Sequence, residues 1–390
     1  MDAKDAARQR IEQLAPQLIE LSHRIHANPE LSFAETKAAA WLSDALEAGG
    51  FDVFRGVCDL PTAFLARAGV APLNIAICAE YDALPGVGHA CGHNIIATAA
   101  LGAALALAPL VGALDITVSV VGTPAEEGGG GKILLLERGA FDGMNAAMMV
   151  HPYPFELAET PTIAAQVFQV DYYGKEAHAS AFPELGINAG DALTVAQVAI
   201  GLLRQRLRPT DRIHGIVSKG GEASNIIPAH TTGAYMARGR TLEELADVMV
   251  QVRRCFDAGA LATGARLEVT AEKPYAEMKS DASIEAAYVA NARRLGREPG
   301  PMTPEVFKRA FSTDMGNVSQ LIPSIHPGIS LECFPDGNHQ PEFATHAASP
   351  AGDRAVVDGA TVMAWTAIDI ATSAPIRERL LAKPFKASKP

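Results

Sequence analysis

The chain has 390 residues, of which 48% are hydrophobic, and this is enough apolar surface for more than one buried core. Its 44 acidic and 33 basic residues give a net charge of −11, and the chain has no basic tract and no cluster of arginine and aromatic residues. The composition therefore excludes the electrostatic attraction on which nucleic-acid binding depends, and we expect a small-molecule partner.

The five cysteines are widely spaced and stand in apolar surroundings: Cys58, Cys78, Cys91, Cys255 and Cys333. An odd number without a regular spacing argues against a disulfide framework and favours a reducing compartment. The first ten residues, MDAKDAARQR, carry charges where a signal peptide needs an apolar run. The sequence therefore predicts a cytoplasmic location.

Two helices are expected at the start of the chain. Residues 5–27 place apolar side chains at helical spacing, and a second helix runs from about 35 to 46. Three short apolar runs follow, and their composition is typical of buried parallel strands: 73–79, 116–122 and 146–150. Residues 1–163 are therefore predicted to form the first part of an α/β domain.

One apolar segment is long enough to cross a membrane. Residues 95–114 hold twenty uncharged positions. However, alanine dominates the segment, Gly102, Pro109 and Gly112 lie within it, and it lacks the Lys or Arg flank that orients a membrane span. We therefore expect a core helix and no membrane partner.

A different pattern begins after residue 163. Residues 164–275 alternate strand and helix signals in the order βαββαβ, which predicts an inserted ferredoxin-like domain. Residues 276–390 return to helices and short strands, so we expect them to complete a mixed-sheet α/β/α domain. The final KPFKASKP, residues 383–390, is predicted to be a loose tail.

Polar side chains follow the three predicted strands of the first segment. Glu80 and Asp82 come after the first strand, Glu126 and Glu127 after the second, and His151 after the third. Ligand sites in open α/β sheets gather outside the carboxyl ends of the strands. We therefore expect these side chains to converge on one crevice.

The stretch GVGHACGHN, residues 86–94, adds His89, Cys91 and His93 to this group. Thiolate and imidazole are the protein ligands that zinc-like ions prefer, although a single Cys or His is more often a core or turn residue.

The adjacent glutamates, Glu126 and Glu127, are also consistent either with a metal site or with an ordinary structural position. Two carboxylates buried together need a cation, because they repel each other in a shared low-dielectric site, whereas a solvated loop needs none. Glycines 128–131 permit close approach of a ligand, but Ile133 after Lys132 excludes a phosphate-binding loop.

Six segments, in this order, carry a family resemblance: AEYDALPGVGHACGHN, GTPAEEGGGGK, MMVHPY, GKEAHAS, NIIP and STDMGNVSQLIPSIHP. They resemble the dinuclear metallopeptidases and amidohydrolases related to aminoacylase and carboxypeptidase G. Within that group they are similar to the branch of hippurate, indoleacetyl-amino-acid and aminobenzoyl-glutamate hydrolases. The GHACGHN subgroup, which includes a dipeptidase acting on β-alanyl dipeptides, is nearest.

The resemblance implies two divalent metal ions, either zinc or manganese, cobalt or nickel. It implies five metal ligands: Cys91, which would bridge the ions, with His93, Glu127, His151 and His339. Glu126 would be the general base, and Asp82 would orient a ligand. Glu80 stands where relatives commonly carry Asp.

The histidine in the C-terminal segment has two possible positions. The family pattern of a histidine followed four residues later by Phe fits His339 with Phe343, while His346 remains an alternative. His89 and His326 are expected in turns or beside the ligands.

The inserted domain is implied to act as a lid and to mediate formation of a homodimer. By resemblance, His178 would stabilise the oxyanion in the partner subunit's site. Asn225 and Arg238 would bind a substrate carboxylate, although Arg238 is equally well explained as a surface arginine on a strand.

The predicted activity is hydrolysis of the amide bond of an N-acyl amino acid or an unusual dipeptide. A hydroxide held between the two ions would attack the carbonyl, with Glu126 as general base. A binding or regulatory protein that keeps the fold is the first alternative. A thiol-redox role for Cys91 is weaker, because no second cysteine lies close in sequence.

Overall fold

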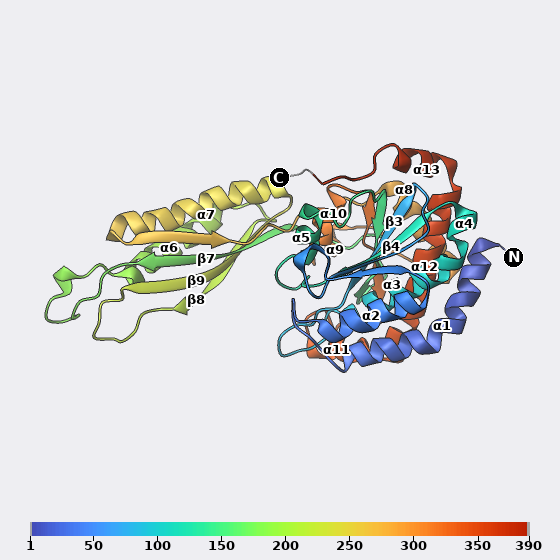
Figure 1. The fold of residues 1–390 in the computed structure, drawn as a ribbon. Coiled ribbons are helices and arrows are strands. Elements are labelled where there is room, and N and C mark those ends of the chain that lie inside the picture. The colour runs from blue at the N-terminus through green and yellow to red at the C-terminus, as the bar shows by residue number, and fades with distance from the viewer. Residues whose placement is uncertain (1, 388–390) are drawn as a thin grey trace. The chain divides into compact units, whose positions relative to one another are not determined.

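The computed structural model describes residues 2–387. The chain divides into two compact units: the first comprises Met1–Pro161 and Met278–Pro390, and the second is Thr162–Glu277. The second unit is therefore an insertion between two segments of the first. Figure 1 labels the elements of both units.

The helices of the first unit are α1 (Ala3–His26), α2 (Thr36–Ala48), α3 (His93–Leu107), α4 (Val111–Leu114), α5 (Gly131–Glu137), α8 (Ala282–Arg294), α9 (Pro304–Phe307), α10 (Met315–Ser319), α11 (Pro341–His346), α12 (Pro350–Thr372) and α13 (Ala374–Leu381). Its strands are β1 (Asp52–Arg55), β2 (Phe64–Ala68), β3 (Asn74–Glu80), β4 (Thr117–Thr123), β5 (Ala146–Met148), β6 (His151–Tyr153), β11 (Ser324–Ile325) and β12 (Gly328–Ser330). The elements expected from the apolar runs agree with these bounds to within a few residues.

The main sheet of the first unit is mixed. Its strand order is β1-β2-β4-β3-β5-β11. Strands β4, β3, β5 and β11 are parallel, whereas β2 pairs antiparallel with both β4 and β1. A two-stranded parallel pair, β6 with β12, lies outside this sheet. The mixed-sheet prediction is confirmed, and the hairpin β1–β2 supplies its antiparallel edge.

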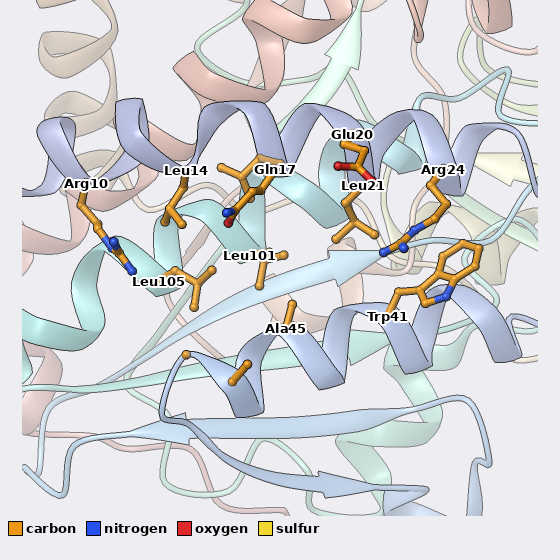
Figure 2. A pocket seen from close by; sticks show the side chains of 13 residues that line it. Arg10, Leu14, Gln17, Glu20, Leu21, Arg24, Trp41, Ala45, Leu101 and Leu105 are labelled. Carbon is orange, nitrogen blue, oxygen red and sulfur yellow. The ribbon is translucent and has the colours of Figure 1, made fainter.

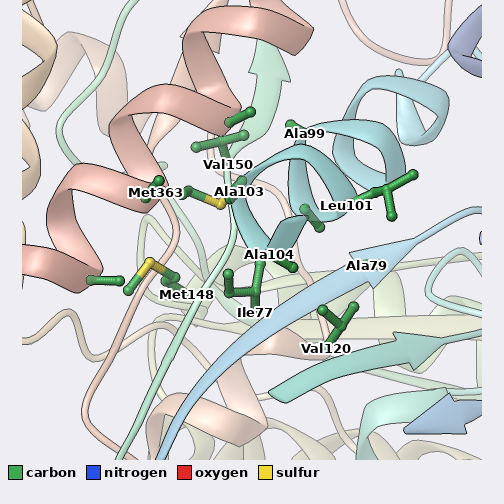
Figure 3. Close-up of a cluster of buried hydrophobic side chains, with 14 of the residues drawn as sticks. Ile77, Ala79, Ala99, Leu101, Ala103, Ala104, Val120, Met148, Val150 and Met363 are labelled. Atoms are coloured by element: carbon green, nitrogen blue, oxygen red, sulfur yellow. The ribbon is translucent and has the colours of Figure 1, made fainter. Parts of the chain in front are cut away.

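Helices cover both faces of the main sheet. Ile75 and Ile77 belong to a core that includes side chains of α1, α3 and α12, and Ala76 and Cys78 belong to a second core with side chains of α5 and α10. Figure 3 shows Ile77 and other strand residues beside α3 and α12. Because successive strand residues face opposite sides, this alternation produces three layers, α/β/α.

The alanine-rich segment that could have crossed a membrane is a core helix. By length and composition both His93–Leu114 and Pro350–Thr372 could span a bilayer, but 67% and 78% of their apolar windows are buried inside the protein. A Cβ atom at Gly102 would come within 2.8 Å of Leu18 and 2.9 Å of Ala360. Small residues along α3 therefore allow α1 and α12 to pack closely against it.

The second unit is a four-stranded antiparallel sheet with two helices. Its elements, in chain order, are β7 (Ala164–Tyr173), α6 (Ala189–Leu203), β8 (Arg212–Lys219), β9 (His230–Gly239), α7 (Leu242–Thr263) and β10 (Arg266–Ala271). The strand order is β10-β7-β9-β8. Phe168, Tyr235 and Ala237 pack with α6 and α7 in a separate core. The side chains that alternate with these core residues therefore point to the other face of the sheet.

The end of the chain is more ordered than its composition suggests. Gly143 donates to the carbonyl of Phe385 (2.8 Å), and Phe385 donates to the carbonyl of Met144 (2.9 Å). The prediction of a loose tail is therefore wrong for residues 385–387, and its last three residues lie outside the described part of the chain. The sequence signal failed because one aromatic residue, Phe385, packs at the edge of the second core of the first unit.

A surface groove of about 350 Å³ lies on the first unit between α1 and α2, with α3 at its base (Figure 2). Leu14, Leu101 and Leu105 give it an apolar floor, and the Arg24 guanidinium lies 4.6 Å from the centre of the Trp41 ring. The residues that line it include none of the predicted site residues. The groove is therefore separate from the predicted site.

Candidate metal centre and active site

The carboxyl ends of the parallel strands bring the predicted residues of the first unit together. Glu80 is the last residue of β3, and Glu126 follows the end of β4 by three positions. His93 begins α3, and His151 begins β6, just after β5. The predicted convergence of strand ends therefore occurs within one unit.

Three groups of ligand atoms lie close enough to hold a metal ion. In each group the ligand atoms are within 4.8 Å of one another, and the groups are Cys91–His93–His151, Cys91–Glu127–His339 and Glu80–His93–Glu126. Because the groups share Cys91 and His93, they form one continuous cluster. All five residues that the family resemblance implies as ligands belong to it.

Short distances define the centre of this cluster. The Cys91 Sγ atom is 3.6 Å from His151 Nε2. The Glu127 carboxylate lies between two imidazoles, 3.8 Å from His93 Nε2 through Oε1 and 3.5 Å from His339 Nε2 through Oε2. These atoms are the usual ligands of zinc-like ions, so the donor set fits a divalent cation.

Buried polar atoms without hydrogen bonds mark the same place. Glu80 Oε2, His93 Nε2 and Glu127 Oε1 are buried and have no hydrogen-bond partner among the described residues. Such atoms are costly unless something compensates for their lost hydration. A divalent cation bound here would compensate all three atoms at once, so the cluster has the chemistry expected of a metal centre.

Hydrogen bonds fix the orientation of two of the three imidazoles in the cluster, those of His93 and His151. His93 Nδ1 donates to Asp82 Oδ1 over 3.1 Å, and His151 Nδ1 donates to the carbonyl of Pro152 over 2.8 Å. In each ring Nε2 is thereby directed toward the cluster. Asp82 also accepts the backbone N–H of Glu127 (3.0 Å) and the hydroxyl of Ser32 (3.1 Å). Asp82 thus joins two of the strand ends.

Burial changes the protonation of these groups. Burial raises the pKa of the Cys91 thiol and of the carboxyl groups of Glu126 and Glu127. The negative charge of Glu80 raises the pKa of Glu126 further. Burial also lowers the pKa of His151 to about 4, so this imidazole is neutral at pH 7 and can coordinate through Nε2. The acidic groups are thus poised to lose protons when a cation binds.

The two histidines of the C-terminal segment have different surroundings. The backbone N–H of His339 donates to the carbonyl of Ala90 over 2.8 Å, which holds His339 beside Cys91. His346 Nε2 instead lies 3.0 Å from Asp336 Oδ2 and belongs to none of the ligand groups. The geometry therefore favours His339 over His346.

His89 and His326 are also outside the ligand groups. His89 is buried with its ring centre 6.1 Å from that of His26. His326 lies beside the cluster, with its ring centre 5.2 Å from that of His151 and its Nδ1 atom 2.5 Å from the hydroxyl of Thr160.

The remaining predicted residues belong to the second unit. His178 is exposed, and its Nδ1 atom accepts the backbone N–H groups of Ser180 (3.3 Å) and Ala181 (3.2 Å). This leaves the proton of the neutral ring on Nε2. Residue 178 forms an isolated bridge with Ile226, so exposed Asn225 lies on the neighbouring segment.

Arg238 lies at the opposite end of the same sheet. It is on β9, opposite Ala165 of β7, whereas the end of β7 that leads to His178 pairs with His230 at the start of β9. Residue 238 lies eight steps along the extended strand from residue 230, a distance of roughly 26 Å. One copy of the second unit therefore cannot bring Arg238 and Asn225 to the same carboxylate.

Comparisons with known proteins identify the family of this chain. A model of the peptidase family M20/M25/M40 matches residues 76–364. The chain belongs to this family. It is 38% identical over 385 residues to a mouse Xaa-Arg dipeptidase, covering 94% of this chain and 88% of the relative. It is 32% identical over 307 residues to one of the polypeptides of the p-aminobenzoyl-glutamate hydrolase of Escherichia coli, covering 73% of this chain and 62% of the relative.

A solved structure has the same fold. The dinuclear metal-binding M20 peptidase of Bacillus subtilis superposes with a TM-score of 0.70 at 22% identity, covering 92% of this chain and 99% of that one. The family and the branches suggested by the sequence motifs are therefore confirmed, and the protein is a member of a family of amide- and peptide-bond hydrolases.

Sequence reasoning missed several side chains that support the cluster. Asn338 Nδ2 lies 3.7 Å from Cys91 Sγ and donates to the carbonyl of Pro152 over 3.1 Å. Buried Glu35 accepts the backbone N–H of Ala125 over 2.9 Å, immediately before the two glutamates. Neither residue stands in one of the six family segments. The burial of Glu35, which is uncommon for a charged residue, is visible only in the structure, so no sequence signal was available for either residue.

Proposed function

We propose that this protein hydrolyses the amide bond of a dipeptide or an N-acyl amino acid, using two divalent metal ions held by the cluster of the first unit. The observation that carries the proposal is the convergence of buried ligand atoms from Glu80, His93 and Glu127 that have no hydrogen-bond partner within residues 2–387. Membership of a family of amide and peptide hydrolases supports the type of reaction.

The proposed roles of the residues follow from their positions. Cys91, which belongs to two of the ligand groups, would hold the ions together with His93, Glu127, His151 and His339. When bound, the ions would polarise the amide carbonyl and increase the acidity of water. Asp82 and the carbonyl of Pro152 would keep the imidazoles of His93 and His151 in the coordinating tautomer.

Glu126 is proposed as the general base and then the general acid. Its carboxylate lies 3.9 Å from His93 Nε2, beside the ligands. Burial and the neighbouring carboxylates raise its pKa, which favours a group that accepts a proton from water and returns it to the leaving amine.

The substrate class follows from the relatives. One is named an Xaa-Arg dipeptidase and another a p-aminobenzoyl-glutamate hydrolase, and both names describe an amide with an amino acid on its nitrogen side. We therefore propose small amides that release a free amino acid, with Arg238 binding the carboxylate of that amino acid.

We further propose that the second unit, with its ferredoxin-like order of elements, acts as a lid and forms a homodimer. The separation of Arg238 from His178 and Asn225 along β9 supports this proposal, because each unit would then serve two active sites. His178 would donate through Nε2 to the oxyanion in the site of the partner subunit. A cytoplasmic location is proposed because all five cysteines are free thiols.

Metal removal and replacement test the reaction. Dialysis against a chelator should abolish hydrolysis of Xaa-Arg dipeptides, β-alanyl dipeptides and p-aminobenzoyl-glutamate, and zinc, manganese or cobalt should restore it. Activity that survives complete removal of metal would contradict the proposal.

Mixing two inactive variants tests the dimer. A His178→Ala subunit paired with a Glu126→Gln subunit contains one complete site only if His178 acts on the partner subunit. An equal mixture should then recover about a quarter of the wild-type activity, since half the dimers are mixed and each has one complete site. If His178 acts within its own subunit, the mixture stays inactive.

A further inference from the structure

A buried lysine of the first unit lies between two buried carboxylates beside the metal centre. Lys132 Nζ is 2.5 Å from Glu80 Oε1 and 2.6 Å from Asp314 Oδ1. The backbone N–H of Lys132 also donates to Asp314 Oδ2 over 2.9 Å. All three side chains are at most 1% exposed, so this ion cluster is shielded from solvent.

Asp314 and Glu80 use their oxygens differently. Both oxygens of Asp314 accept hydrogen bonds from Lys132, one from the backbone N–H and one from Nζ. Only Oε1 of Glu80 contacts Lys132, and Oε2 has no hydrogen-bond partner within residues 2–387. The lysine therefore fixes the Glu80 carboxylate while leaving one of its oxygens available.

The available oxygen faces the metal centre. Glu80 Oε2 lies 3.6 Å from His93 Nε2, which is itself buried without a hydrogen-bond partner among the described residues. These two residues and Glu126 each offer a ligand atom, and the three atoms lie within 4.8 Å of one another. Three ligand atoms this close together, two of them without a hydrogen-bond partner in residues 2–387, fit the arrangement that a cation requires.

We propose that Glu80 is a further protein ligand, and that its Oε2 atom binds the ion held by His93. Lys132 and Asp314 are positioning residues that fix Glu80 in the binding orientation. This inference rests on the proposed two-ion site. The additional carboxylate makes the surroundings of this ion richer in oxygen, and it favours manganese over softer ions at this position.

The structure of the wild-type protein saturated with zinc tests the ligand directly. We expect two ions, with Glu80 Oε2 about 2.0–2.2 Å from one of them. Two bound ions with Glu80 Oε2 more than about 3 Å from both would overturn this inference and leave the two-ion site intact. A protein that binds no zinc at saturation would overturn both.

Two variants provide an independent test in solution. Glu80→Gln removes the charge of the proposed ligand but keeps an acceptor for Lys132, and Asp314→Asn perturbs the same ion cluster without touching a proposed ligand. Zinc binding would be measured by competition with a chelating dye, and thermal unfolding would show whether each variant is folded.

We expect Glu80→Gln to weaken one of the two zinc equivalents by at least about 100-fold, because loss of a ligand should exceed the 10–100-fold effect of an outer residue. The cobalt-substituted variant should also show a changed visible absorption spectrum, which reports coordination number. Asp314→Asn should weaken zinc binding by about 10-fold or less and leave the spectrum unchanged. Equal losses of zinc and equal spectra in the two variants would assign Glu80 a structural role only.

Discussion

In the first unit, Glu80, His93 and Glu127 lie close together at the ends of strands and at the start of α3. Each has one buried side-chain atom without a hydrogen-bond partner among the described residues. In the second unit, His178 and Asn225 are exposed, and Arg238 lies at the other end of the sheet. The first set is therefore preorganised within one compact unit. The second set has no such arrangement, because its residues lie apart on one sheet.

This difference predicts different consequences of mutation. Changes in the first set should alter metal binding or the chemical step in every subunit that carries them. Changes in the second set should leave the metal centre intact and affect catalysis through substrate binding and assembly.

Glu126→Gln should have the largest effect. The amide cannot accept the proton of the attacking water, so kcat should fall by about 10³-fold, within the 10²–10⁴-fold range of general-base catalysis. Zinc content per subunit, measured by atomic absorption, should stay at the wild-type value. Normal turnover in this variant would remove Glu126 from the mechanism.

His178→Ala should come next. Loss of one oxyanion donor typically reduces kcat by about 10²–10³-fold. Because His178 belongs to the second unit, the zinc affinity of the variant should equal that of the wild-type protein. If the variant lost zinc together with activity, the claim that residues of the second unit do not affect metal binding would be wrong.

His339→Ala and His346→Ala form a matched pair. His339 Nε2 is 3.5 Å from Glu127, so its loss should weaken zinc binding by at least about 10-fold. His346 pairs with Asp336 outside the cluster, and its loss should change zinc affinity and kcat by less than about twofold. If a zinc titration showed that only His346→Ala weakens zinc binding, His346 would be the metal ligand in place of His339.

Arg238→Lys should have the smallest effect among the site variants. Lysine keeps the positive charge but loses the two-pronged contact with a carboxylate, so KM should rise about 10-fold with little change in kcat. Steady-state kinetics with an Xaa-Arg dipeptide would measure this. An unchanged KM would show that Arg238 does not bind the substrate and is an ordinary arginine on a strand.

The parallel strands and the residues at their ends were predictable from sequence. The runs before Glu80, Glu126 and His151 are apolar and short because these strands are buried on both faces, and parallel topology places their ends at one edge. The hairpin β1–β2 gave no such signal, since β1 has only four residues and most of them are exposed.

The partners of the acidic residues were not predictable. Lys132 and Asp314 are 182 positions apart, and the sequence contains no trace of their contact. Lys132 could be excluded from a phosphate loop, but its pairing with Glu80 depends on how β3, α5 and α10 pack. Long-range ion pairs of this kind arise from the fold and leave no local pattern.

The glycines after Glu127 had a structural function that the sequence did not specify. A Cβ atom at Gly131 would lie 1.8 Å from the carbonyl oxygen of Pro124, and one at Gly129 would lie 2.4 Å from the ring of Phe33. Because these glycines have no side chain, Pro124 and Phe33 can pack directly against the backbone of the loop. These contacts hold the loop that carries the two glutamates.

Helix α3 begins at His93, a proposed metal ligand, and continues into the first core, where Gly102 packs closely against Leu18 and Ala360. Any ion that His93 binds is thereby linked to the folding equilibrium of the whole first unit, and saturation at 100 times the Kd would add about 2.7 kcal/mol of stability. The melting temperature should thus rise with metal concentration, and calorimetry could rank physiological cofactors without any knowledge of the substrate.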